Sequence, residues 1–114
     1  MSPARALAPA RVRGTAPVFA ALGDETRLGL VQRLSTDGPG SIVRLREGST
    51  LSRQAITKHL TILSQAGLVR DRRVGRERVW RLDPDRIAQA RKYLDRISAQ
   101  WDGALLRLKT FVEG

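Results

Sequence analysis

The chain has no cysteine, a single histidine and no long hydrophobic run. The lack of cysteine excludes disulfides, thiolate metal sites and thiol redox sensing. One imidazole, His59, cannot supply the ligand set of a transition-metal site within a subunit. We therefore expect neither a bound metal nor a cofactor. Because no segment is apolar enough for a membrane span or a secretory signal, we expect a cytoplasmic protein.

Aromatic residues are also scarce: the chain has two Phe, two Trp and one Tyr among 114 residues. The core of a chain of this length must therefore consist mainly of Leu, Ile, Val and Ala. Such a composition favours helices, and the length favours a single domain. The scattered carboxylates and the lone histidine do not provide a catalytic nucleophile together with a general base. The sequence consequently predicts a protein that is not an enzyme.

Positive charge, by contrast, is abundant and concentrated. The segment from Arg44 to Arg81 holds ten basic and three acidic residues, so it carries +7 of the net charge of +10. The same segment has the pattern of two helices followed by an arginine-rich hairpin. A basic block that coincides with a helix-turn-helix pattern indicates a protein that binds a polyphosphate.

The organisation along the chain begins with residues 1–14, whose mixture of Pro, Ala, Arg and Gly predicts a flexible basic arm. The remaining residues, 15–114, are expected to form one domain. Its first helix should cover 15–22, and Asp24 should cap a second helix that ends at Ser35. We then expect a short strand at 41–43 and a brief helix at 44–48, with Leu45 pointing inward.

The most strongly specified segment is Leu51–Val69, LSRQAITKHLTILSQAGLV. Ser52 can cap a helix over 53–66, and Gly67 followed by Leu68 predicts a Schellman ending. Three residues, Ile56, Leu60 and Leu63, form an apolar stripe at helical spacing. The opposite face is short, polar and basic, with no acidic residue from Arg53 to Gln65.

An arginine-rich hairpin follows, turning at Val74-Gly75-Arg76-Glu77 with Gly75 where positive φ is needed. Trp80 and Leu82 share the face expected to pack on the helices. Asp83 then caps, and Pro84 opens, a long helix over 84–112. Apolar residues recur in this helix every seven positions, so it has an a/d seam. At about 43 Å it is longer than a small domain can cover, so the seam predicts self-association.

Taken together, the helix order, the motif Leu22-Gly23-Asp24-Glu25-Thr26-Arg27-Leu28, Lys58-His59-Leu60, Ala66-Gly67-Leu68-Val69 and the closing Val79-Trp80-Arg81-Leu82 resemble the ArsR/SmtB family. This resemblance covers about Val18 to Val112. It implies a mainly α winged helix-turn-helix with a small β-hairpin wing, and a homodimer built by the first and last helices. The chain departs from metal-sensing members because it lacks their cysteine box, so it is similar to the cysteine-free members.

The resemblance and the polar face together define the expected site. The residues expected to contact DNA are Arg53, Gln54, Thr57, Lys58, His59, Thr61, Arg72, Arg73, Arg76 and Arg78. Gln, Lys and Thr on the helix can read base edges, whereas arginines suit phosphates or the minor groove. For His59 a half-buried structural role is an open alternative. The residues expected at the dimer interface are Phe19, Leu22, Ile87, Leu94, Ile97, Trp101, Leu105, Leu108 and Phe111.

These features predict a homodimeric, sequence-specific DNA-binding regulator, and in particular a repressor, acting on a near-palindromic double-stranded operator. Two alternatives remain open at this point. The basic block alone would equally suit a non-specific or architectural nucleic-acid binder. A winged fold with a heptad helix would also suit a protein-binding adaptor.

Overall fold

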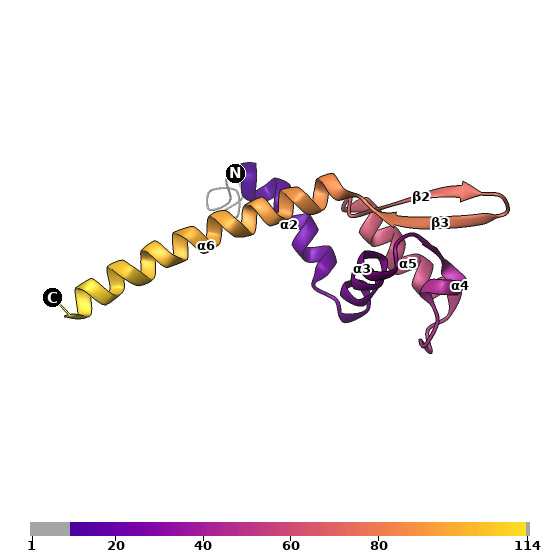
Figure 1. The fold of residues 1–114 in the computed structure, drawn as a ribbon, viewed down its shortest axis with the longest axis horizontal. Helices are drawn as coiled ribbons and strands as arrows, with labels where there is room; N and C mark the ends of the chain where they lie inside the picture. The colour runs from indigo at the N-terminus through magenta and orange to yellow at the C-terminus, as the bar shows by residue number, and fades with distance from the viewer. Residues whose placement is uncertain (1–9, 114) are drawn as a thin grey trace, which may run out of the picture.

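The computed structural model describes residues 10–113, which form five helices and a three-stranded sheet. In chain order they are α2 (Ala10–Leu22), α3 (Glu25–Asp37), β1 (Gly40–Ser41), α4 (Ile42–Leu45), α5 (Arg53–Gln65), β2 (Val69–Val74), β3 (Glu77–Leu82) and α6 (Pro84–Glu113). Helices α3, α4 and α5 cluster at one end, the β2–β3 hairpin projects from them, and α6 extends the other way (Figure 1). The mainly helical fold with a β-hairpin wing is confirmed.

The first helix starts earlier than the sequence predicted. It begins at Ala10 rather than after Thr15, although it ends at Leu22 as expected. Residues 10–14 are therefore helical and not an arm, while residues 1–9 of the predicted arm lie outside the described residues. Gly14 costs a helix only about 1 kcal/mol, and it lies inside α2. The local Gly and Pro signals therefore do not mark the start of this helix.

Packing of one face of α5 forms the centre of the core. Ile56, Leu60 and Leu63 are almost completely buried, as the stripe predicted. They pack with the inward side chains of the other elements, and the cluster comprises Val18, Ala21, Leu30, Leu34, Leu45, Ile56, Leu60, Leu63, Leu68, Val69, Trp80 and Ala90. Each fully buried Leu or Ile contributes about 1.5–3 kcal/mol relative to exposure. The orientation of α5 about its own axis is therefore strongly determined.

Both ends of α5 are fixed by the interactions that its sequence predicted. The Ser52 hydroxyl accepts a hydrogen bond from the Ala55 amide at 3.1 Å. At the other end the Leu68 amide donates to the Leu63 carbonyl at 3.0 Å and the Gly67 amide to Ser64 at 2.9 Å. These two bonds define a Schellman motif, with Gly67 at φ +80°. Helix α5 consequently has fixed limits.

The short elements before α5 are displaced from their predicted positions. The strand is Gly40–Ser41 rather than 41–43, and the helix is Ile42–Leu45 rather than 44–48. The shift arises because Ser41 caps α4, its hydroxyl accepting from the Arg44 amide, which draws Ile42 and Val43 into the helix. Leu45 is buried as expected.

The sheet is antiparallel with strand order β1-β3-β2. Gly40 pairs with Trp80, and Val74 pairs with Glu77 across the two-residue turn Gly75-Arg76. Gly75 has φ +63°, which confirms the predicted turn and suits its tight two-residue geometry. Trp80 is 1% exposed, so the wing is anchored to the helices at its base.

Only the first half of the last helix packs on its own domain. The Asp83 carboxylate accepts from the Asp85 amide at 3.0 Å, which confirms the cap. Ile87 and Ala90 pack against the core. The C-terminal half of α6 runs free of the body (Figure 1), and the molecule is 65 Å long as a result. The large apolar side chains that α6 leaves exposed are Leu94, Trp101, Leu105, Leu106, Leu108, Phe111 and Val112.

The Schellman ending gives a direct test of how α5 is held. A Cβ on Gly67 would force a side chain into a left-handed conformation and would lie 2.9 Å from Arg86 Nε. We expect Gly67→Ala to lower the free energy of unfolding by about 1–2 kcal/mol, measured by urea denaturation. Gly103→Ala is the control, because Gly103 lies inside α6 with its nearest neighbour at 3.4 Å, and it should raise stability by up to about 1 kcal/mol. Equal effects of the two substitutions would contradict this account.

Candidate nucleic-acid interface

The outward face of α5 carries the residues that the sequence singled out for base contact. Gln54, Lys58, Thr61 and Arg53 are exposed, and Thr57 is half-buried. Within the described part of the chain, the Arg53, Gln54 and Lys58 side chains have no hydrogen bond or ion pair. Their donors are consequently available to an external acceptor.

The two threonines of this face are oriented by their own helix. Thr57 Oγ1 donates to the Arg53 carbonyl at 2.8 Å, and Thr61 Oγ1 donates to the Thr57 carbonyl at 2.9 Å. Because the hydroxyl hydrogens are committed, each side chain offers outward only oxygen lone pairs and a methyl group. Such a group can accept from an amino group of a base or contact a thymine methyl.

His59 is placed apart from that face. Its Nδ1 lies 3.3 Å from Arg27 Nη1 and 3.8 Å from Asp24 Oδ2, both at the start of α3. Arg27 Nε also donates to the Ala21 carbonyl at 2.6 Å, so this cluster joins α2, α3 and α5. The amide of Arg27, bonded to the Asp24 carboxylate, holds the pKa of that carboxyl below its usual value. The placement of His59 favours the structural alternative over DNA contact.

Strand pairing divides the arginines of the wing between its two faces. Arg73 is opposite Arg78 in the register and shares the face of Trp80, whereas Arg72 is opposite Val79 on the other face. Arg76 lies in the exposed turn at the tip. The four arginines predicted to contact DNA therefore point in at least two directions.

Arg78 is engaged within the wing itself. Its Nε donates to Asp71 Oδ2, and its guanidinium carbon lies 4.5 Å from the centre of the Trp80 ring. The cation–π contact and the ion pair hold the side chain in one orientation. Arg78 is thus less available to a phosphate than Arg72, Arg73 and Arg76.

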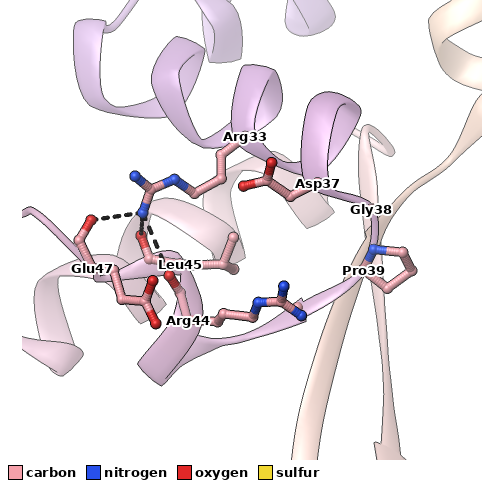
Figure 2. Close-up of a pocket in the computed structure, with 8 residues that line it drawn as sticks. Arg33, Asp37, Gly38, Pro39, Arg44, Leu45 and Glu47 are labelled. Carbon is pink, nitrogen blue, oxygen red and sulfur yellow. Dashed lines mark hydrogen bonds between the residues drawn. The ribbon is translucent and has the colours of Figure 1, made fainter.

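One arginine that the sequence did not single out holds the turn before α5. Arg33 Nη1, on α3, donates to the carbonyls of Glu47 at 2.7 Å, Leu45 at 3.2 Å and Arg44 at 3.4 Å, as Figure 2 shows. It therefore supplies a hydrogen-bond donor to three carbonyls at and just beyond the C-terminal end of α4. Since these contacts span 11 to 14 residues, no local pattern reveals them.

A second unanticipated contact joins the wing to α6. Arg70 Nε donates to Asp83 Oδ2 at 2.7 Å, and Asp83 also caps α6. This bond with Arg70 is the main reason that the pKa of Asp83 lies below its usual value. The base of the wing and the start of the long helix are therefore held by one carboxylate.

Across residues 10–113, no three His, Cys, Asp or Glu side chains gather closely enough to hold a metal ion. Within the same range, none of the helices combines the length and hydrophobicity that a membrane span requires.

Helix α5 buries an apolar stripe and presents a polar, basic outer face; the short helix α4 precedes it and the β2–β3 hairpin follows it. This arrangement defines a winged helix-turn-helix DNA-binding transcription regulator. Residues 22–72 match the family described as helix-turn-helix domain. Comparison with known proteins also shows that the chain belongs to the ArsR family.

The similarities extend over most of the chain. It is 42% identical to the HTH-type transcriptional regulator Rv2034 of Mycobacterium tuberculosis, over 75% of this chain and 76% of that protein. It is 38% identical to the arsenical resistance operon repressor of Escherichia coli, over 68% and 67% of the two chains. The solved structure of an ArsR-like transcriptional regulator from Rhodococcus sp. RHA1 matches with a TM-score of 0.73 and 38% identity, covering 87% of this chain and 92% of that one.

The Arg70–Asp83 pair predicts a specific response to acid. Asp83 titrates near 3.8 when unperturbed and lower in the fold, so the ionised pair stabilises the fold above about pH 4. That contribution is lost as pH falls through the lowered value. We expect Asp83→Asn, which keeps a capping side chain, to be less stable at pH 7 and to lose less stability on acidification, as measured by urea midpoints.

The control is Asp95→Asn, which removes an exposed carboxylate that has no hydrogen bond or ion pair among the described residues. It should retain the acid dependence of the unmodified protein. Identical pH profiles for the two variants would show that Asp83 is not responsible.

Proposed function

We propose that this chain is a homodimeric, sequence-specific DNA-binding repressor that acts in the cytoplasm and has no catalytic activity. The observation that carries the proposal is the outward face of α5, which is polar, basic and free of acidic residues while the opposite face is buried. A surface helix that only faced water would have no reason to exclude carboxylates. A helix that enters a major groove would be repelled by them.

Base reading is assigned to the middle of this face. Lys58 can donate to guanine N7 and O6, Gln54 can pair with adenine, and the Thr57 and Thr61 methyl groups suit thymine. Arg53, at the start of the helix, is assigned to a phosphate. In the wing, Arg72, Arg73 and Arg76 are assigned to phosphates or the minor groove, with Arg78 supporting the wing from within.

The dimer is assigned to the apolar side of α6 together with α2. Leu94, Trp101 and Leu108 repeat at seven-residue spacing and are 52–68% exposed in the single chain. Contiguous exposed apolar surface of this kind marks an interaction site, and a second copy supplies the same stripe. Near the domain, Phe19 lies 5.9 Å from Tyr93 between ring centres, which joins α2 to α6. Two recognition helices would then meet half-sites about 34 Å apart.

Repression is proposed from the chain's relatives and from sterics. The Escherichia coli relative is named as an operon repressor. A dimer bound across a promoter would block access of the transcription machinery without any additional protein. The absence of cysteine argues against thiolate metal sensing as the release mechanism.

Dimerisation can be tested with two matched leucines. Leu108 and Leu106 are 58% and 65% exposed, yet they lie about 160° apart around α6 at 100° per residue. We expect Leu108→Glu to convert the dimer to a monomer, because it places a charge in the apolar seam. Leu106→Glu, on the polar side, should remain dimeric. Sedimentation velocity distinguishes these outcomes, and a monomeric unmodified protein at micromolar concentration would refute the dimer.

Sequence-specific reading can be tested with two cations. Lys58→Ala should remove about 1–3 kcal/mol of discrimination between the selected site and a scrambled duplex. Arg76→Ala should weaken both duplexes equally and reduce the salt slope of binding by about one unit. The DNA site is identified by a random-library binding selection on the purified protein. Affinities are then measured by fluorescence anisotropy at several salt concentrations. If no duplex outcompetes random DNA, the alternative of a non-specific binder holds.

A further inference from the structure

A second basic surface lies away from the outward face of α5. It is a groove of about 290 Å³ between the start of α2 and the first half of α6. The two helices lie side by side there (Figure 1). The groove is lined by Ala10, Gly14 and Thr15 of α2 and by Arg86, Gln89, Lys92 and Arg96 of α6.

Among the described residues that line this groove, every charged side chain is positive and none is a carboxylate. Arg86, Gln89, Lys92 and Arg96 follow one another along α6 at spacings of three or four residues, so neighbouring members of the series lie on the same side of the helix. Lys92 and Arg96 are exposed and have no hydrogen bond or ion pair to any residue the structure describes. Three cations around one space repel one another unless an anion lies between them.

Arg86 is already held in position at this groove. Its Nη1 donates to Gln89 Oε1 at 3.3 Å. Its Nε approaches Gly67 so closely that a Cβ there would lie 2.9 Å away. Arg86 is therefore preorganised at the C-terminal end of α5, which reduces the ordering cost of binding an anion.

The position of the groove separates it from the proposed DNA contacts. Gly67 follows the last turn of α5, whereas Arg53 begins the helix, and 13 residues place the two ends about 20 Å apart. Recognition helices contact bases mainly through their N-terminal part. A ligand in the groove would thus sit behind the recognition helix, between the two helices assigned to the dimer.

We propose that this groove binds a small, multiply charged oxyanion, such as a phosphorylated or polycarboxylate metabolite. Guanidinium and ammonium groups are the donors that proteins use for phosphate and carboxylate oxygens. The volume suits a small molecule rather than a protein segment. A bound anion would neutralise the three cations, all of which α6 supplies.

The test uses pyrophosphate as the probe and the full chain without DNA. Isothermal titration calorimetry at constant ionic strength, balanced with sodium chloride, should show one pyrophosphate bound per chain. Lys92→Glu should weaken this binding by about tenfold or more, since a repulsive charge replaces an attractive one. Lys109→Glu, on the same helix but outside the groove, should bind like the unmodified protein. Thermal melts without ligand check that both variants are folded.

Two outcomes would overturn the proposal. The first is no binding, or equal binding by both variants, which would reduce the effect to net charge. The second concerns DNA as the source of the phosphate. If Lys92→Glu, and not Lys109→Glu, lowers the salt slope of duplex binding by about one unit, the groove contacts the DNA backbone instead. Because the calorimetry contains no DNA, its result is independent of whether the chain is a sequence-specific repressor.

Discussion

Burial of the apolar stripe of α5 is the constraint on which the rest of the molecule depends. With Ile56, Leu60 and Leu63 at most 1% exposed, rotation of α5 about its axis would expose several large side chains at about 25 cal/mol per Å². Ser52 and Gly67 fix where the helix starts and ends. Burial of the apolar face therefore also fixes the direction in which the polar face of α5 points. The surface presented to a nucleic acid is a consequence of core packing.

The long helix α6 also has an apolar face, but only the first part of that face is buried. Near its start, Ile87 and Ala90 bury their side chains in the domain. Further along, the same seven-residue spacing continues through Leu108 and Phe111, which are 58% and 83% exposed. A heptad pattern that outlasts the domain stabilises nothing within a single chain. The unburied half of the seam is the strongest physical argument for a second copy.

The sequence predicts those elements whose determinants are local. Ser52, Gly67, Gly75 and Asp83 act within a few residues of their positions, so the limits of α5, the wing turn and the start of α6 could be read directly. By contrast, β1 depends on pairing with Trp80 some 40 positions away, and no local pattern encodes such a long-range contact. The start of α2 at Ala10 is also missed, because the Gly and Pro signals before Thr15 do not interrupt the helix.

The same distinction applies to the candidate site. Counting charges identifies ten basic residues between Arg44 and Arg81 but cannot say which are free. Three of them make internal contacts through Nε: Arg46 to the Leu51 carbonyl, Arg70 to Asp83, and Arg78 to Asp71. Those arginines stabilise the turn before α5, the base of the wing and the pairing of its two strands. The charge that remains available is concentrated on α5 and the outer part of the wing, so internal pairing narrows a diffuse basic block to a directional surface.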